Sequence, residues 1–464
     1  MTATSDKIQR PNTCYNSFRS HLISTVPSKE SELNKFGEVK LCGKIIQAQY
    51  IGQICFLKLK DPSSQLQLIL NKENDDIKVF FDSKIKLGDI ISTNGRLCFS
   101  KAGVLSLDVK NCSVLSKCTA IMPKKIVNKD FKMSHKYLEL CLDPVALNRF
   151  TTCSLTVKVI RKYLYENEFL EFDTQILKSK YGGGQSKPFK THHNSLDREF
   201  FLRITSELEL KQLIIGGYEK VFELSKSFRN EGIDAKHYPE FTMLEVCEAY
   251  SSCKDLMNLM TNLIRKTVKD VTGTDKINYS GNIVNFGLDW HELTTKDAIL
   301  KYGEIDIEQM RESPQEMKLI ATKLNMNPTS TYSAIIDKLL EKKVEPHLIH
   351  PTFITNLPVG MTPFAKTIES NSSYTDRAWL YAGGLDLCDI YSSLTDVEKL
   401  KINFAKQDKV TNVEKEYSHM RNDFMEALTY GAPPIANLGL SVSRLQMLLT
   451  NSEDIQDIIL FPRG

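Results

Sequence analysis

The sequence has no run of about 18 apolar residues, so none of its segments is predicted to cross a membrane. Its eleven cysteines are an odd number and include no Cys-x-x-Cys pair. This spacing argues against a structural zinc site and a disulfide framework, and it favours a reducing compartment. The N-terminus lacks a strong arginine-rich amphipathic pattern. We therefore expect a cytoplasmic protein, with the mitochondrial matrix as the alternative location.

An excess of one charge sign is also missing, because the formal net charge is only +3 at pH 7. A nucleic-acid partner would therefore need a local basic face. With 41% hydrophobic and 25% charged residues, the chain has the composition of a globular protein that can bury a large core. Its 464 residues predict two or three domains.

Short β-like segments separated by turn residues fill the N-terminal part of the chain. The five segments are 39–46, 54–59, 66–70, 89–97 and 104–109, and a helix is expected near 76–85. Five short strands at this spacing predict a Greek-key barrel of the OB type over residues 37–118. Such barrels bind single-stranded nucleic acid by stacking bases on aromatic side chains.

The remaining pattern predicts a larger mixed domain. Residues 1–36 are expected to form a disordered or loosely docked tail, 119–143 a linker, and 144–464 the second domain. An apolar stripe predicts a helix over 145–168, with members Phe150, Cys153, Val157, Ile160 and Leu164. Strands are expected at 169–177 and at 202–208, the latter carrying a buried carboxylate. Between them, residues 182–184 are three glycines that suit a flexible loop, or a plain turn.

The most informative stretch runs from residue 222 to residue 250. A strand ends near Phe228, a charged loop follows, and Pro239 forces an extended backbone before a second strand at 241–246. We expect the two strands to form an antiparallel pair. Arg229 at the strand end can fork onto a phosphate, and His237 across the loop can add a second contact. The alternative is a solvated hairpin with an ordinary ion pair.

These residues resemble motif 2 of the class II aminoacyl-tRNA synthetases, and the lysine enzymes in particular. The matching residues are 228–232 (FRNEG), His237, 239–242 (PEFT) and Glu245. Residues 145–177 resemble motif 1 of that family, and 438–449 resemble motif 3. The resemblance spans residues 38 to 462. It implies an α+β fold, with an N-terminal OB-fold β-barrel, a class II antiparallel sheet flanked by helices, and a homodimer.

The resemblance also implies roles for individual residues. The catalytic residues would be Arg229 and Arg444, and ATP would be bound by Arg229, Glu231, His237, Phe241 and Arg444. The amino acid would be bound by Gly183, Glu207, Glu245, Asp389 and Tyr391. The tRNA anticodon would be read by Phe56 and Gln67, and Mg²⁺ would be held by Asp386. By itself, Phe56 could be a core residue, and Arg444 could be a surface residue at a helix start.

Several positions depart from the family pattern. Trp379 replaces one magnesium-binding acid, and Ser393 replaces the glutamate that pairs with the lysine ε-ammonium. The other departures are Cys247 for a tyrosine, Gln175 for the motif 1 proline, Ser441 and Ser443 for the glycine and aspartate of motif 3, and the shorter Asp386. A desolvated ammonium without a carboxylate partner is costly. One hypothesis is that Asp389 supplies the missing charge.

Three functional hypotheses follow. The first is a lysine–tRNA ligase that uses ATP and Mg²⁺ to activate lysine and transfers it to tRNA(Lys) in protein biosynthesis. The second is a synthetase-derived protein that has lost aminoacylation and binds tRNA or regulates. The third is an active enzyme with another amino acid or acceptor. ATP–pyrophosphate exchange with each amino acid would distinguish them.

Overall fold

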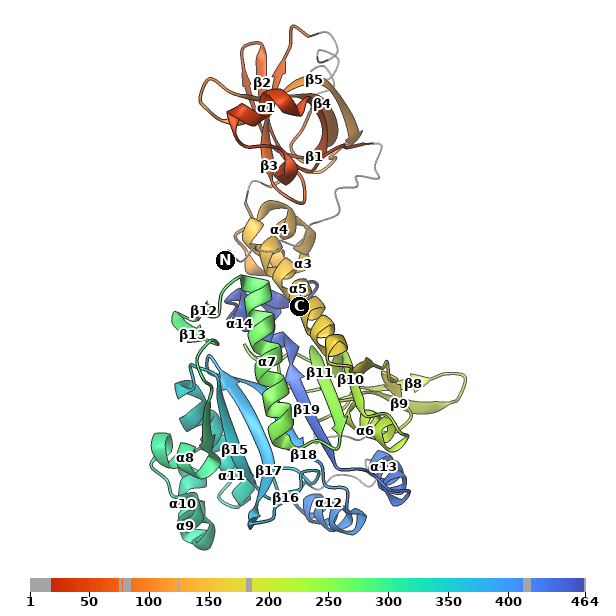
Figure 1. Cartoon of the computed structure of the whole chain (residues 1–464), viewed down its shortest axis with the longest axis vertical. Helices are drawn as coiled ribbons and strands as arrows, with labels where there is room; N and C mark the ends of the chain where they lie inside the picture. The colour runs from red at the N-terminus through yellow and green to blue at the C-terminus, as the bar shows by residue number, and fades with distance from the viewer. Residues whose placement is uncertain are drawn as a thin grey trace, which may run out of the picture. The chain divides into compact units, whose positions relative to one another are not determined.

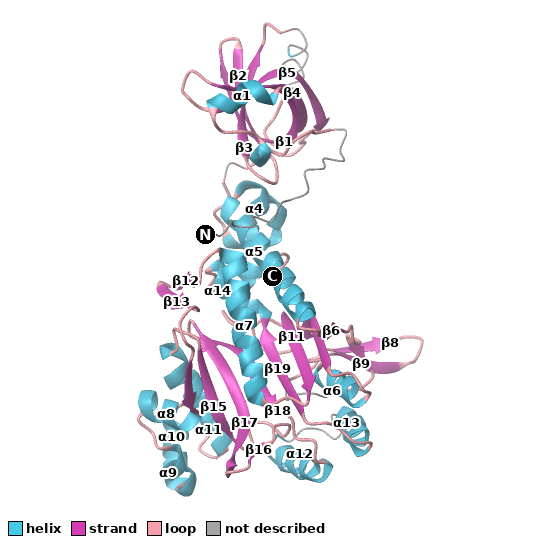
Figure 2. Ribbon diagram, in the orientation of Figure 1, coloured by secondary structure: helices cyan, strands magenta, loops and turns pink. Residues whose placement is uncertain are grey.

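The computed structural model describes residues 18–74, 77, 85–123, 125–180, 186–411 and 419–462. The chain divides into two compact units, Met1–Leu142 and Asp143–Gly464. Figures 1 and 2 label their helices and strands. In the part of the chain that is described, no helix has both the length and the apolar character needed to cross a bilayer.

The N-terminal unit contains a closed barrel with the strand order β1-β2-β3-β5-β4 (Figure 2). Its strands are β1 (Glu38–Ile51), β2 (Ile54–Lys60), β3 (Gln65–Asn71), β4 (Ile90–Phe99) and β5 (Leu105–Ser116). On β2, Cys55, Leu57 and Leu59 are buried and alternate with more exposed residues, as a barrel wall requires. The predicted OB-type barrel is confirmed. Of the predicted helix at 76–85, only residues 77 and 85 lie within the described residues.

The segment before the barrel is not loosely docked where it is described. The 3₁₀ turn Ile23–Thr25 and helix α1 (Glu30–Phe36) place Ile23 and Leu33 in the barrel core. The backbone N–H of Ile23 also donates to Asp61 Oδ2 at 2.7 Å. The predicted loose tail is therefore wrong for residues 18–36, because two apolar side chains and a buried hydrogen bond hold them to the barrel.

After the barrel, residues 119–143 were expected to be a linker. This stretch includes two short helices, α3 (Lys129–Ser134) and α4 (Lys136–Leu142). Asn128 caps α3 by accepting from the backbone N–H of Phe131 at 2.8 Å. Regular structure thus begins at Lys129 and extends, with a break at His135, to Leu142, where the first unit ends.

The C-terminal unit is built on a nine-stranded mixed sheet with the order β14-β15-β17-β18-β19-β11-β10-β6, and with β16 beside β17 (Figure 1). Its strands are β6 (Leu170–Glu171), β10 (Lys220–Phe228), β11 (Glu240–Ala249), β14 (His291–Thr294), β15 (Thr352–Pro358), β16 (Thr367–Ile368), β17 (Asn371–Ala382), β18 (Leu385–Ser392) and β19 (Ile435–Ser441). Two smaller sheets are also described. One comprises β7 (Leu177–Lys178), β8 (Lys190–His193) and β9 (Arg198–Leu202). The other comprises β12 (Lys276–Tyr279) and β13 (Asn282–Asn285).

Helices flank this sheet, which confirms the predicted α+β class. They are α5 (Pro144–Glu166), α6 (Glu207–Ile215), α7 (Cys253–Thr272), α8 (Thr295–Gly303), α9 (Ile307–Glu312), α10 (Pro314–Lys323), α11 (Tyr332–Leu339), α12 (Val397–Thr411), α13 (His419–Thr429) and α14 (Val442–Thr450). Helix α5 is the predicted apolar-stripe helix, and it begins with Pro144 at its first turn and Asp143 as its cap.

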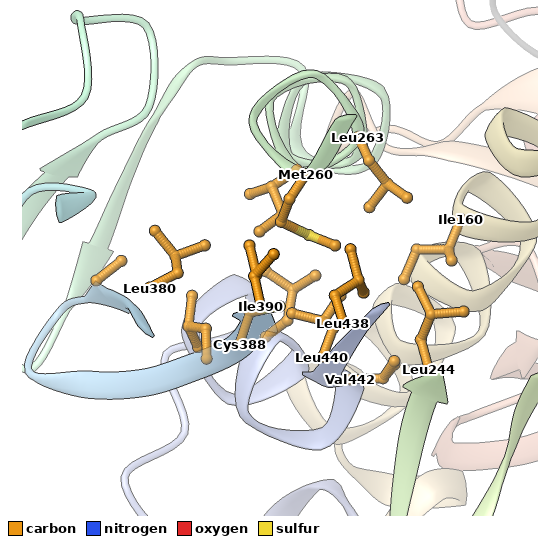
Figure 3. Close-up of a cluster of buried hydrophobic side chains, with 14 of the residues drawn as sticks. Ile160, Leu244, Met260, Leu263, Leu380, Cys388, Ile390, Leu438, Leu440 and Val442 are labelled. Carbon is orange, nitrogen blue, oxygen red and sulfur yellow. The ribbon is translucent and has the colours of Figure 1, made fainter. Parts of the chain in front are cut away.

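The central strands have one face in the main core and the other at the site. Side chains from β11, β17, β18 and β19 pack with α5 and α7 (Figure 3). The core-facing strand residues include Leu244, Val246, Ala378, Leu380, Cys388, Ile390, Leu438 and Leu440. Because side chains alternate along a strand, the residues between them project from the opposite face. Those intervening residues include Glu245 and Asp389, two of the predicted amino-acid-binding side chains.

The strand predicted over 169–177 is wrong for most of its length. Only β6 and β7 at its two ends are extended in sheets. Between them, the backbone N–H and the hydroxyl of Thr174 bond Glu223 Oε2, at 3.3 and 2.8 Å. The backbone is thus satisfied by a buried carboxylate instead of a neighbouring strand.

The strand predicted over 202–208 is also wrong. Strand β9 ends at Leu202, and helix α6 begins at Glu207. Acidic side chains at Glu207 and Glu209 in the first turn favour a helix start, because the helix dipole is positive there. The carboxylate of Glu207 therefore projects from a helix N-terminus.

Candidate functional site

The predicted motif 2 hairpin forms as an antiparallel pair. Strands β10 and β11 pair from Lys220 opposite Glu248 to Phe228 opposite Glu240. The next residue, Arg229, closes the strand end by donating its backbone N–H to the carbonyl of Pro239 at 2.9 Å. The hairpin therefore fixes the backbone position from which the Arg229 side chain projects.

Two adjoining cavities lie at this face of the sheet. The smaller has a volume of about 250 Å³ and is lined by residues that include Glu207, Glu245, Asp389 and Tyr391. The larger has a volume of about 970 Å³ and is lined by residues that include Glu231, His237, Phe241, Asp386 and Arg444. Both are lined by Arg229, Met243, Asp389 and Gly439. Arg229 is thus a cation at the junction of the two cavities.

All five residues predicted to bind ATP line the larger cavity. The guanidinium of Arg229 lies 5.0 Å from the ring centroid of Phe241. Burial lowers the pKa of Arg229, and the carboxylates of Glu231 and Glu245 oppose that shift. Its Nε is buried and has no hydrogen-bond partner among the described residues. An unpaired buried donor on a cation suits an anionic ligand.

Arg444 is held in place by the start of helix α14. Ser441 caps this helix, accepting from the backbone N–H of Arg444 at 3.3 Å. The side chain of Arg444 is only 12% exposed, so the alternative of a surface arginine is wrong. Its Nη2 donates to His237 Nε2 at 2.9 Å, and His237 Nδ1 donates to Asp234 at 2.9 Å.

The residues near Asp386 do not fit a resident Mg²⁺ site. The Asp386 carboxylate accepts from Arg444 Nη1, and the indole of Trp379 stands where the family has a second acid. Within the described residues, no group of three or more His, Cys, Asp or Glu could hold a metal ion. Mg²⁺ is bound through carboxylate oxygens. Asp386, Asp389 and Glu345 line the larger cavity, and each is already paired with a cation, namely Arg444, Arg377 and Lys236 in that order.

The smaller cavity brings the two predicted glutamates together. Thr205 connects them, because its hydroxyl accepts from the backbone N–H of Glu207 at 3.1 Å and donates to Glu245 Oε1 at 2.8 Å. Burial and then the charge of Glu207 raise the pKa of Glu245 to about 8, against the opposing effects of Thr205 and Arg229. Gly183, also predicted to bind the amino acid, lies outside the described residues.

Asp389 is already paired with a cation. Arg377 binds both of its carboxylate oxygens, with Nε to Oδ1 at 2.8 Å and Nη2 to Oδ2 at 2.6 Å. The indole N–H of Trp379 also donates to Oδ1, at 3.0 Å. Such bidentate pairs are strong and geometrically specific. The hypothesis that Asp389 supplies a free charge for a substrate ammonium therefore has no support in this geometry.

Three other departures from the family pattern, Cys247, Ser393 and Ser443, are buried behind the cavities, whereas Ser441 lines the larger cavity. Ser393 donates to Asn437 Oδ1 at 2.7 Å, and both side chains are buried. Cys247 is buried in an apolar cluster, and this burial raises the pKa of its thiol. Ser443 accepts from the backbone N–H of Thr242 at 3.0 Å and so ties α14 to β11. Cys247, Ser393 and Ser443 thus pack behind the site without lining it, whereas Asn437 lines the smaller cavity.

Sequence reasoning missed two cations of the site, Arg377 and Lys211. Arg377 faces Tyr391 across the β17–β18 hairpin, but a β-bulge between Leu380 and Tyr381 shifts this register by one residue, so the glycine pair at the turn does not predict it. Lys211 lies four residues after Glu207 on α6 and bonds it at 2.6 Å. Residues four apart are neighbours on a helix but not on a strand, so the predicted strand did not indicate this pair.

The barrel presents the predicted anticodon residues on its outer surface. Phe56 and Gln67 lie on neighbouring strands, because Phe56 pairs with Ile69 and Lys58 pairs with Gln67. Both predicted residues are half-buried on the face opposite to Leu57. The alternative of Phe56 as a core residue is therefore wrong.

The two units and this site define a class of protein. Residues 128–464 match the family described as tRNA synthetases class II (D, K and N), and residues 39–115 match the OB-fold nucleic acid binding domain. The first match alone covers more than half of the sequence. The chain belongs to the class II tRNA synthetases.

Within that class, it is similar to proteins named "Lysine--tRNA ligase". It is 35% identical over 463 residues to that of Buchnera aphidicola subsp. Schizaphis graminum, covering 96% of this chain and 92% of the relative. It is 35% identical to that of Moorella thermoacetica, covering 92% and 88%. It is 32% identical to that of Dehalococcoides mccartyi, covering 95% and 90%.

Proposed function

We propose that this chain is a lysine–tRNA ligase, which activates lysine with ATP and transfers it to tRNA(Lys). One observation carries the proposal: Arg229 lines both an acidic cavity of amino-acid size and a larger cavity with aromatic and basic side chains. An amino acid in the first and a nucleotide in the second would meet at that guanidinium. The names of the relatives favour lysine as the amino acid.

In the first step, a carboxylate oxygen of lysine attacks the α-phosphorus of ATP. The bond from that phosphorus to the bridging oxygen breaks, and pyrophosphate leaves. No proton has to move, so the task of the protein is to hold two anions in line and neutralise the developing charge. In this proposal Arg229 does so at the α-phosphate and His237 binds the outer phosphates, while Arg444 covers the face of adenine opposite Phe241. Mg²⁺ enters as the counter-ion of ATP.

The remaining parts of the substrates would be held by the neighbouring residues. Phe241 and Glu231 would position adenine. The α-ammonium group of lysine would lie between Glu207 and Glu245, and Tyr391 would form a wall of the pocket. A ribose hydroxyl of tRNA then attacks the acyl carbon, and AMP leaves. The role of the barrel in this step would be to hold the anticodon.

The proposal includes a homodimer. Several large apolar side chains near the motif 1 region are exposed in the single chain. They are Tyr165, Leu170, Ile176 and Leu177. Contiguous exposed apolar side chains are typical of interaction sites. Sedimentation velocity of the purified protein tests this, and a monomer at micromolar concentration would contradict it.

ATP–pyrophosphate exchange tests the activation step directly. We expect exchange with lysine in the intact protein and loss of it in Arg229→Ala, because the junction of the two cavities would lose its charge. Lys254→Ala is a matched control, because it removes an exposed cation paired with Glu292 on the other side of the sheet. Exchange only with another amino acid, or none from folded protein, would contradict the proposal.

A further inference from the structure

A lysine side chain is completely buried beneath the smaller cavity. Lys211 on α6 has 0% exposure. Its Nζ donates to Glu207 Oε1 at 2.6 Å and to the hydroxyl of Tyr391 at 3.2 Å. Both partners line the cavity, whereas Lys211 itself does not. The ammonium group therefore contacts the cavity wall from behind.

Three aromatic rings enclose the same ammonium. The Nζ lies 4.9 Å from the ring centroid of Tyr391, 5.1 Å from that of Phe364 and 5.8 Å from that of Phe424. These rings come from β18, from the segment before β16 and from α13. Aromatic faces attract a desolvated cation, so the cage stabilises Lys211 without a second carboxylate. Its position is therefore set by three separate elements.

The contacts leave one oxygen of Glu207 for another group. Oε1 accepts from both Lys211 and the hydroxyl of Tyr391. No side chain or backbone group among the described residues bonds Oε2, and the Glu207 side chain retains 13% exposure at the cavity. A carboxylate fixed through one oxygen presents the other in a single orientation. This is the arrangement needed to hold a substrate ammonium.

We propose that Lys211 is a positioning residue of the amino-acid cavity, which fixes Glu207 so that Oε2 meets the ammonium of the bound amino acid. The inference rests on the proposed function, because it takes the smaller cavity as the amino-acid site. It deepens that function by assigning a role to a residue that touches no substrate. Lys211 also limits the cavity to one free acidic oxygen on this wall, which favours a single ammonium there.

Three variants test this role: Lys211→Met, Glu207→Gln and the double variant. Methionine keeps the length and apolar stem of lysine and removes the charge. We expect Lys211→Met to raise the KM for lysine in pyrophosphate exchange about 10–100-fold. The KM for ATP and kcat should change little, because only uniform binding of the amino acid is lost. Lys266→Met is the matched control, since it removes a lysine from an exposed pair with Asp270.

The double variant separates positioning from general structure. Each single variant leaves one buried charge without its partner and should lower the unfolding midpoint, whereas the double variant should recover it. If Lys211 acts through Glu207, the KM for lysine in the double variant should equal that of Glu207→Gln. Additive effects on that KM would overturn the proposal. So would equal losses for ATP and lysine, or an unchanged lysine KM in Lys211→Met.

Pyrophosphate exchange by the wild-type protein tests the proposed function separately. If the protein activates a different amino acid, the lysine assignment fails, and the same variants are measured with that amino acid, since every amino acid carries the α-ammonium. If it gives no exchange, lysine binding by calorimetry replaces the KM. A folded wild-type protein that binds no amino acid overturns the role of Lys211 as well.

Discussion

Glu245 is a buried carboxyl group whose pKa is raised from 4.5 to about 8, first by burial and then by Glu207. Between those pH values the unfolded chain has lost this proton while the folded chain retains it. The free energy of unfolding should therefore fall as pH rises through this window. The contribution is fully present below pH 4.5 and lost above about pH 8.

Replacing Glu245 by glutamine should remove this dependence. We expect the stability of Glu245→Gln relative to wild type to increase from pH 5 to pH 9 by an amount on the order of 3 kcal/mol. Urea unfolding at both pH values measures this. Glu240→Gln is the control, since Glu240 is exposed on the same strand. If wild type and Glu245→Gln respond to pH alike, Glu245 is ionised at neutral pH and the inference is wrong.

At the level of single residues, the sequence predicted which side chains gather at the cavities better than it predicted their contacts. The motif 2 positions Arg229, His237 and Phe241 do gather at one cavity. The pairing of Asp389 with Arg377, however, depends on strand register, and that of Arg444 with His237 joins residues 207 positions apart. Periodicity alone carries no information about such contacts.

Strand β17 carries Trp379 into the larger cavity next to Asp389 on β18. Because this indole stands where the family has an acid, we predict that Mg²⁺ without ATP hardly changes the thermal unfolding midpoint of the wild-type protein. Trp379→Glu should add a carboxylate near Asp386 and Asp389. Like charges then repel, so the variant should be less stable with chelator and be restabilised by millimolar Mg²⁺.

Differential scanning fluorimetry with chelator and with Mg²⁺ measures this effect. Trp379→Gln is the matched control, because it loses the same indole contacts without gaining charge. A wild-type midpoint that rises with Mg²⁺ as much as that of Trp379→Glu would contradict the prediction. It would mean that the described carboxylates already hold the ion.

Among elements, the strongly periodic ones were predictable and the irregular ones were not. The barrel strands and helix α5 follow from apolar spacing. The apolar alternation of residues 202–208 continues past Leu202 and so predicts a strand, although acidic side chains start a helix at Glu207. The strand predicted over 169–177 is mostly absent because a buried carboxylate, that of Glu223, takes the place of a strand partner at Thr174.

At the scale of the whole molecule, the proposed function assigns tRNA recognition to the barrel and amino-acid activation to the C-terminal unit. We predict that Phe56→Ala raises the KM for tRNA about tenfold or more, because a stacked base is worth about 1–3 kcal/mol. Gln67→Ala should also raise this KM, because the amide can hydrogen-bond to a base edge. Pyrophosphate exchange without tRNA should be unchanged. Leu115→Ala, an exposed apolar residue on β5, is the control. An equal loss for Leu115→Ala would show that the effect is not specific to the β2–β3 surface.

The domain order was readable from sequence because each unit has its own pattern, short alternating strands first and then mixed helices and strands. The resemblance also favoured lysine as the amino acid, in agreement with the relatives named "Lysine--tRNA ligase", although the chain departs from its family at Ser393 and Cys247. Both residues lie in the packing behind the cavity. Which amino acid fits therefore depends on the shape that the whole domain gives to the pocket.

The most direct test is to supply the protein with ATP, Mg²⁺, total tRNA and all standard amino acids in competition. The amino acid esterified to the tRNA is then identified by mass spectrometry. We predict lysine on tRNA(Lys), with loss of the product in Arg229→Ala. A different amino acid on tRNA, or no product from a folded protein that still binds tRNA, would contradict lysine–tRNA ligase activity.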